Sequence, residues 1–180
     1  MTYYGAKELA RSFRTVRKNT LQIAEEIPED KYGFRPAEGC RSVAETLAHI
    51  AVMPRVAEQI HFIEHCSMLV GFDFFGLMGK LQAEVKTPRT KAEILDLLHT
   101  EGEKFATKLE GVSDAFLGEQ VEYPEGMEPR VKSRFEMLLA IKEHEMHHRA
   151  QLMMIERMLG ITPHLTRRME EAVAAAQARR

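Results

Sequence analysis

The sequence is poor in cysteine and has no long hydrophobic run. Its two cysteines, Cys40 and Cys66, are far apart and do not form the CxxC pattern of a metal or redox site. The first residues contain no apolar signal core, and no stretch of about 20 apolar residues follows them. We therefore expect a cytoplasmic protein that does not enter a membrane, and two thiols that stay reduced.

The chain also has little net charge. It contains 25 Lys and Arg against 27 Asp and Glu, a balance of −2 over 180 residues. A general nucleic-acid binder would be strongly basic, so we expect no nucleic-acid partner. We see neither an internal repeat nor a low-complexity linker, and we expect one domain over residues 1–180 with a peripheral tail at 166–180.

Four segments have the periodicity of amphipathic helices. In the first, apolar or small residues recur at steps of three and four, and Pro28 ends it. The next three open with Ser42, Thr90 and Ser133, each followed three residues later by a glutamate, which is the pattern of a capping box. The pattern predicts long helices over about 9–27, 42–66, 90–111 and 133–159.

Irregular segments separate these helices. Pro54 should kink the second helix. The apolar, glycine-rich connector at 67–89 predicts little more than a short helical turn, and it is long enough to cross one end of a bundle. Residues 112–130 should be mostly irregular, and the alanine-rich tail could form a short surface helix. The fold class is therefore all-α, a four-helix bundle.

Three of the eight histidines are predicted to face the core. His49 shares a stripe with Met53 and Val56 when each residue advances by about 100° around the helix. His144 and His148 are four residues apart, so they project from one side of the fourth helix. Alone, His49 could be a core histidine bonded to a neighbour, and the pair could be an exposed polar patch. Together, on helix faces that would meet, they predict a metal site.

The other histidines are predicted to face away from the core. His61 and His65 are also four residues apart, but they should point about 120° and 160° away from His49. His99 and His147 lie off the core stripes of their helices. His164 follows the glycine that ends the fourth helix.

Three neutral imidazoles could hold zinc, nickel or iron(II) and leave coordination positions open, as a catalytic site requires. Glu145 and Gln151 lie beside the predicted ligands. Each could bond an imidazole, orient water or contact a substrate. A fourth position filled by Glu145 would instead favour a structural site. Arg149 is expected to be exposed or paired with an acid.

A competing motif overlaps this site. Residues 144–148 satisfy HExxH, the zinc metalloprotease pattern in which the glutamate activates water. The longer form of that motif fails, because Met154 stands where a third histidine would be. We keep a metallohydrolase as the weaker alternative.

Two segments resemble the DinB-like (YfiT/DinB) superfamily of metal-binding four-helix proteins. They are residues 42–50 (SVAETLAHI) and 144–152 (HEMHHRAQL), supported by 32–37 (YGFRPA). The resemblance extends over the helical order to about Leu165. It implies an up-down-down-up bundle, a homodimer, and metal ligands at His49, His144 and His148. Ala150 departs from the family's usual glycine, a change that should not disturb the ligands.

The resemblance also implies a function. Characterised relatives include thiol S-transferases that use bacillithiol or mycothiol, in which the metal would lower the pKa of the thiol. We therefore expect a metal-dependent transferase acting on a small-molecule thiol and an electrophile. The alternative is a non-catalytic metal-binding or stress-response module.

Overall fold

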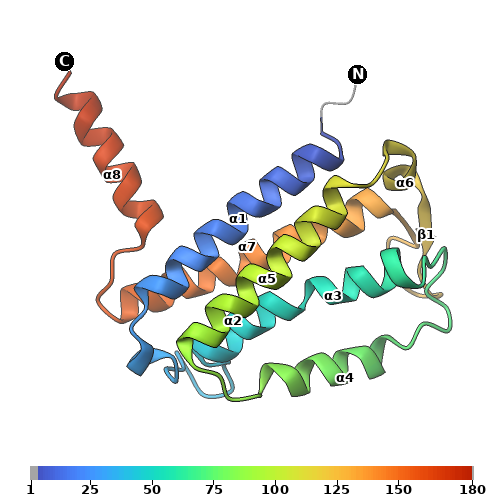
Figure 1. Cartoon of the computed structure of the whole chain (residues 1–180), viewed down its shortest axis with the longest axis horizontal. Helices are drawn as coiled ribbons and strands as arrows, with labels where there is room; N and C mark the ends of the chain where they lie inside the picture. Colours follow the sequence, from blue (N-terminus) through green and yellow to red (C-terminus); the bar gives the residue numbers. More distant parts are fainter. Residues whose placement is uncertain (1–3, 180) are drawn as a thin grey trace.

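The computed structural model describes residues 4–179 and is built almost entirely of helices (Figure 1). The bundle consists of α1 (Ala6–Glu26), α2 (Val43–Val52) continued by α3 (Pro54–Ala57) and the π-helix η2 (Glu58–Ile63), α5 (Lys91–Glu110) and α7 (Arg134–Met158). The remaining elements are η1 (Glu29–Lys31), α4 (Phe74–Val85), α6 (Asp114–Gly118), β1 (Gln120–Glu122), β2 (Val131–Ser133) and α8 (His164–Gln177).

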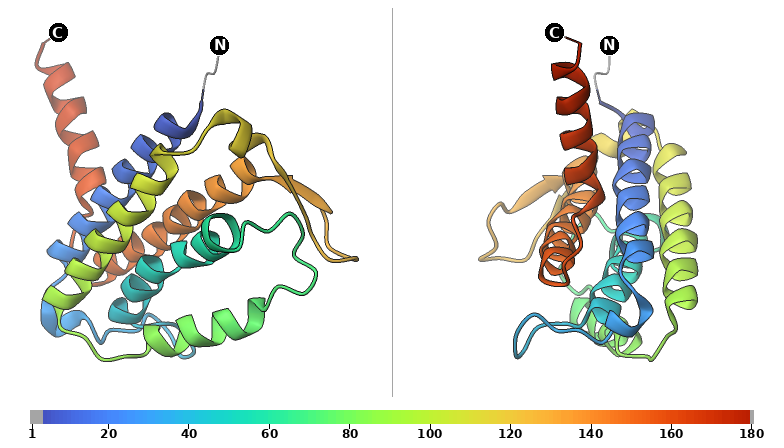
Figure 2. Two further views of the ribbon diagram at one scale, coloured as in Figure 1. Left: turned by 45° about the vertical axis from the view of Figure 1, so that its right-hand side comes forward. Right: turned by 90° about the vertical axis from the view of Figure 1, so that its left-hand side faces the viewer.

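The helices form an up-down-down-up bundle. Helix α1 packs against α5 and α7, and α2 packs against the same two helices. Helices α2 and α5 run in one direction, and α1 and α7 run in the other (Figures 1 and 2). The connector that holds α4 returns along the side of the bundle, so that α5 can start at the same end as α2 (Figure 1). The predicted fold class is confirmed.

The periodicity identified the core face of α1 correctly. All of its predicted core residues are buried, namely Leu9, Phe13, Val16, Thr20, Ile23 and Ile27. The three predicted capping boxes are also present. These features could be read from sequence because each depends on residues only three or four positions apart.

The Ser42 cap places the first turn of the helix that carries His49, and its removal has a measurable cost. The Glu45 amide donates to Ser42 Oγ at 3.1 Å, and the Ser42 amide donates to Glu45 Oε2 at 2.9 Å. We expect Ser42→Ala to lower the free energy of unfolding by about 1 kcal/mol in urea denaturation. Ser67→Ala, at an exposed position, is the control. An equal change in both variants would contradict the assignment of the cap.

The second predicted helix is not continuous. It is interrupted at Pro54, as expected, but its last part is a π-helix rather than an α-helix. A π-helix turns less per residue than an α-helix, so the 100° rule fails beyond this point. Two predictions were therefore wrong. The stripe of His49 and Val56, continued at about 100° per residue, places Ile63 in the core and His61 outside it, whereas Ile63 is 61% exposed and His61 is buried.

His61 has a structural partner in the core. Its Nδ1 lies 3.0 Å from a guanidinium nitrogen of Arg134, which is buried and also donates to Glu119 at 2.8 Å. Burial, followed by the charge of Arg134, lowers the pKa of His61 to about 4. The ring is therefore neutral at pH 7 and can accept from Arg134. Its inward position follows from this long-range contact, which the local sequence does not reveal.

The connectors contain more regular structure than predicted. The 67–89 segment holds the twelve-residue helix α4, whose first turn is capped when the Gly76 amide donates to Asp73 at 2.9 Å. Residues 112–130 contribute α6 and β1, and β1 pairs antiparallel with β2. The tail is helical as expected, but α8 begins at His164 and extends away from the bundle (Figures 1 and 2).

Between residues 4 and 179, we find no helix that is both long and apolar enough to cross a membrane. Both cysteines are free thiols.

Candidate metal centre

Three histidines converge between two packed helices. His49 lies on α2, and His144 and His148 lie one turn apart on α7. His49 Nε2 is 3.0 Å from His144 Nε2, and His148 Nε2 is 3.2 Å from the same atom. The structure thus brings together the three residues that the sequence analysis selected, and their donor atoms all lie within 4.8 Å of one another.

These separations fit a shared cation. Two nitrogens about 2.05 Å from one ion would be about 3.3 Å apart at a tetrahedral angle and about 2.9 Å apart at a right angle. Hydrogen bonding explains the arrangement less well. A ring nitrogen either donates one proton or accepts at one lone pair, whereas His144 Nε2 faces two other Nε2 atoms. One cation could instead accept a lone pair from all three rings.

The imidazoles are in the protonation state that a metal ligand requires. His49 and His148 are 6% and 8% exposed, and His144 is half-buried. Burial, with smaller contributions from Arg41 and the neighbouring rings, lowers the pKa of His49 to about 3 and that of His144 to about 4. Burial also lowers the pKa of His148, although its hydrogen bond to Gln151 opposes the shift. All three rings are therefore neutral at pH 7, so protons do not compete with a metal there.

Gln151 orients one of the ligands. Its Oε1 lies 2.7 Å from His148 Nδ1, and its Nε2 lies 3.1 Å from His147 Nε2. If the Gln151 amide donates to His147, its carbonyl oxygen accepts from His148 Nδ1–H. This arrangement leaves the lone pair of His148 on Nε2, toward the other two rings. The expectation that Gln151 could bond an imidazole matches this contact. His147 itself is exposed, as predicted.

Glu145 does not support the imidazoles. Its side chain is 2% exposed, and both of its carboxylate oxygens accept from the guanidinium of Arg17 at 2.9 Å. Within the described chain, its carboxylate makes no hydrogen bond to a histidine and does not join the three-histidine group. The HExxH interpretation requires this glutamate to activate water at the metal, so the ion pair with Arg17 argues against it.

Two further residues differ from expectation. Arg149 was expected to be exposed or paired with an acid. It is half-buried, it forms no ion pair with a described acid, and its Nε has no hydrogen-bond partner among residues 4–179. His164 is buried in the molecule, where its Nε2 lies 3.3 Å from Asn19 Oδ1. It does not join the three-histidine group. Its burial depends on how α8 leaves the bundle, which the glycine at the end of α7 does not determine.

Two cavities flank the histidines. One of about 420 Å³ reaches His49 and is lined by charged residues that include Arg41 and Lys86. The other, of about 600 Å³, reaches His148 and Gln151. Its apolar wall consists of Pro36, Met154, Ile155 and Met158. No described cysteine or acidic residue joins the histidine group, so a cation held by the three imidazoles would have positions left for other ligands.

Arg41 is a charged residue that lines both cavities, and it was missed by sequence reasoning. It lines both of them, and its charge contributes to the lowered pKa of all three histidines. Arg41 is exposed, and no described acidic side chain forms an ion pair with it. The only local signal is its position directly before the Ser42 capping box.

Comparisons with known proteins give a consistent result. A family model described as the DinB superfamily matches residues 12–152. The YjoA protein of Bacillus subtilis is 26% identical over 161 residues, which span 87% of this chain and 92% of that protein. Its crystal structure, described as a DinB-like protein, has a TM-score of 0.62 at 22% identity, covering 86% of this chain and 94% of that one.

Two further structures share the fold. YfiT from Bacillus subtilis, described as a probable metal-dependent hydrolase with an unusual four-helix bundle topology, has a TM-score of 0.67 at 14% identity. That match covers 90% of this chain and 91% of YfiT. A protein from Clostridium difficile 630 has a TM-score of 0.64 at 14% identity, covering 87% of this chain and 98% of that one. These likenesses support the bundle.

Proposed function

The chain belongs to the DinB superfamily, and we propose that its three-histidine site binds one divalent cation and activates a low-molecular-weight thiol for transfer to an electrophile. The observation that carries this proposal is the convergence of three neutral imidazoles beside two cavities, with no fourth protein ligand among the described residues. Zinc, nickel and iron(II) all accept imidazole ligands. The choice of a thiol rests on the family resemblance.

The proposed chemistry assigns distinct tasks to the protein. A divalent cation at the site would lower the pKa of a thiol at its open side. The sulfur, after losing its proton to solvent, would form a bond to the electrophilic atom, and the leaving group would depart with the electron pair of the broken bond. His49, His144 and His148 would hold the cation, and Gln151 would keep His148 in the ligating tautomer.

Arg41 would favour an anionic reactant. It lines both cavities, where its positive charge would stabilise a thiolate or another anionic group of the thiol. We expect Arg41→Gln to raise the KM for an anionic thiol by about 10-fold, the lower end of the range for one hydrogen bond to a charged group. Lys18→Gln removes the same charge from a different cavity and should leave the KM unchanged. Equal effects of the two substitutions would show that Arg41 has no specific role.

Hydrolysis is the second candidate. It is favoured by the description of YfiT as a probable metal-dependent hydrolase, and the same open positions could activate water. The ion pair of Glu145 with Arg17 means that such a hydrolase would need a general base other than the HExxH glutamate. A metal-binding module without catalysis is the third candidate.

One assay separates these functions. Protein loaded in turn with zinc, nickel or iron(II) is incubated with an electrophile, with and without each member of a thiol panel. Turnover that requires a thiol and is lost in His148→Ala would support the transferase. Thiol-independent turnover that is lost in the same variant would support the hydrolase. Metal binding without turnover under any condition would support the non-catalytic module.

The homodimer and the cytoplasmic location remain predictions from the sequence. Light scattering in solution would test the homodimer.

A further inference from the structure

A buried arginine connects all four long helices of the bundle. Arg17, on α1, is 4% exposed. Its guanidinium donates to both carboxylate oxygens of Glu145 on α7, to the carbonyl of Leu98 on α5, and to the carbonyl of Ile50 on α2 at 3.2 Å. Such a group is costly to bury unless its donors are paired, and here each of its three nitrogens has an acceptor.

Two of these acceptors adjoin metal-ligand candidates. Ile50 directly follows His49, and Glu145 directly follows His144. One planar guanidinium therefore connects the two chain segments whose side chains must meet at the metal site. The hydrogen-bond geometry of the guanidinium is fixed, so it restricts the distance between α2 and α7 at the level of the histidines.

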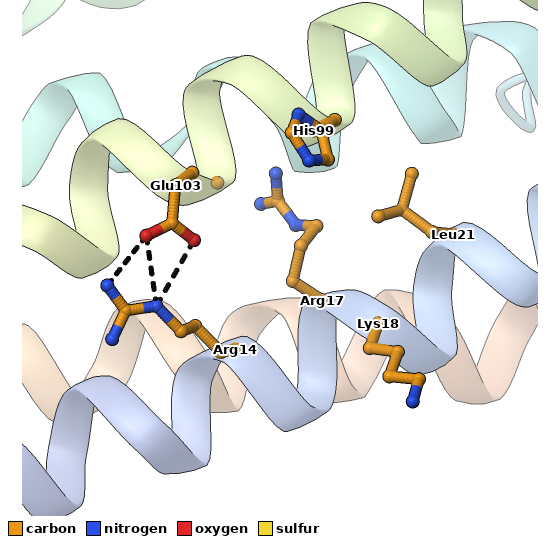
Figure 3. Close-up of a pocket in the computed structure, with 7 residues that line it drawn as sticks. Arg14, Arg17, Lys18, Leu21, His99 and Glu103 are labelled. Carbon is orange, nitrogen blue, oxygen red and sulfur yellow. Dashed lines mark hydrogen bonds and ion pairs between the residues drawn. The ribbon is translucent and has the colours of Figure 1, made fainter.

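The neighbouring helix leaves space for this arginine. On α5, a Cβ atom added at Gly102 would lie 2.8 Å from Arg17 Cγ and 2.9 Å from Arg17 Nη1. Any larger residue there would force Arg17 or helix α5 to shift. Figure 3 shows Arg17 extending from α1 to α5, whereas Arg14, one turn earlier, bonds to Glu103. The two arginines on α1 thus have different surroundings: Arg14 forms surface ion pairs, and Arg17 forms a core contact.

Stability alone explains this arrangement poorly. Replacing a buried ion pair with apolar residues of similar volume is often neutral or stabilising, so the pair is weak evidence for a stabilising role. A metal site, however, requires its ligands to be held within a few tenths of an ångström. We propose that Arg17 is a positioning residue that sets the spacing of the two ligand-bearing helices, and thereby the affinity and geometry of the metal site. This inference rests on the metal-binding part of the proposed function and is independent of its thiol chemistry.

The test uses cobalt(II), whose visible absorption reports coordination geometry. The full-length chain is titrated with cobalt(II) alone, and both the Kd and the spectrum are recorded. Arg17→Lys keeps the charge but cannot contact all three acceptors at once. Gly102→Ala keeps every charge and every metal ligand, and its added Cβ crowds Arg17 directly. The matched controls are Arg14→Lys on the same helix and Gly79→Ala on α4, where an added Cβ meets no atom within 4 Å.

We expect Arg17→Lys and Gly102→Ala to weaken cobalt(II) binding by about 10-fold or more and to alter the spectrum, as substitutions outside the ligand shell do. The controls should stay within about twofold of the parent protein. A purely structural role would lower the urea midpoint of the variants without changing the Kd or the spectrum, and that result would overturn the inference. If Arg17→Lys does not fold, the Kd and spectrum of Gly102→Ala decide whether Arg17 positions the metal ligands. Failure of the parent protein to bind cobalt(II) would instead refute the proposed metal site itself.

Discussion

Replacing His144 with alanine is expected to abolish stoichiometric metal binding. His144 Nε2 is the central atom of the group, at 3.0 Å from His49 Nε2 and 3.2 Å from His148 Nε2. Without it, two imidazoles remain on different helices, too few to hold a divalent ion tightly. The loss of metal affinity should exceed the roughly 10–100-fold loss that follows the removal of a hydrogen-bond partner outside the ligand shell. Elemental analysis and calorimetric titration should find about one ion per chain in the parent protein and none in the variant.

The controls for this experiment follow from the surroundings of the other histidines. His99→Ala removes an exposed imidazole from α5 and should leave both stoichiometry and affinity unchanged. His61→Ala should also leave metal binding unchanged, although it should destabilise the fold because Arg134 loses a buried acceptor. Loss of binding in His61→Ala with retention in His144→Ala would show that the metal lies elsewhere.

The sequence predicts this site because the relevant geometry is local. Capping boxes mark where α2 and α7 begin, and counting from them places His49, His144 and His148 on the core faces of their helices. The two faces meet because α2 packs against α7 in the bundle. The resemblance to a known family selects the same residues. Together these signals recover most of the bundle and all three candidate ligands.

The errors arise where a distant part of the chain decides the outcome. The π-helix at 58–63 changes the helix phase, and the buried His61 contacts Arg134, which lies on another helix. The sequence places Glu145 beside the predicted ligands, but only the structure reveals that its carboxylate accepts from Arg17, 128 positions earlier. The pairing of β1 with β2, which runs from Gln120↔Ser133 to Glu122↔Val131, is a hairpin contact that helical periodicity does not indicate either. Periodicity indicates which face is buried and does not identify the partner.

Glu156 is a buried carboxyl group whose surroundings come from distant parts of the chain. It lies on α7 two turns beyond the metal site and is 0% exposed, and neither of its carboxylate oxygens has a hydrogen-bond partner among the described residues. Burial, and then the negative charge of Glu26, raises its pKa from 4.5 to about 7. The positive charges of Arg167 and Arg157 only partly offset this rise. The carboxyl is therefore held in a site that favours its neutral form.

Glu156 should consequently make the stability of the protein depend on pH. Because its pKa is raised in the folded state, its protonated form stabilises the fold. Its contribution to the free energy of unfolding is fully present below about pH 4.5 and is lost as the pH rises through about 7. The difference in pKa corresponds to about 3 kcal/mol, since each unit is worth about 1.4 kcal/mol. Glu156→Gln, which stays neutral at every pH, should remove this dependence.

The measurement compares free energies of unfolding in urea at pH 5 and pH 8. Relative to Glu156→Gln, the free energy of unfolding of the parent protein should fall by on the order of 2–3 kcal/mol from pH 5 to pH 8. The buried histidines titrate in both proteins, so their contributions cancel in the comparison. Glu171→Gln, at an exposed position on α8, is the control and should differ from the parent by the same amount at both pH values. A parent-to-variant difference that does not change with pH would mean that Glu156 is already ionised at pH 5, and that a cation or ordered water compensates its burial.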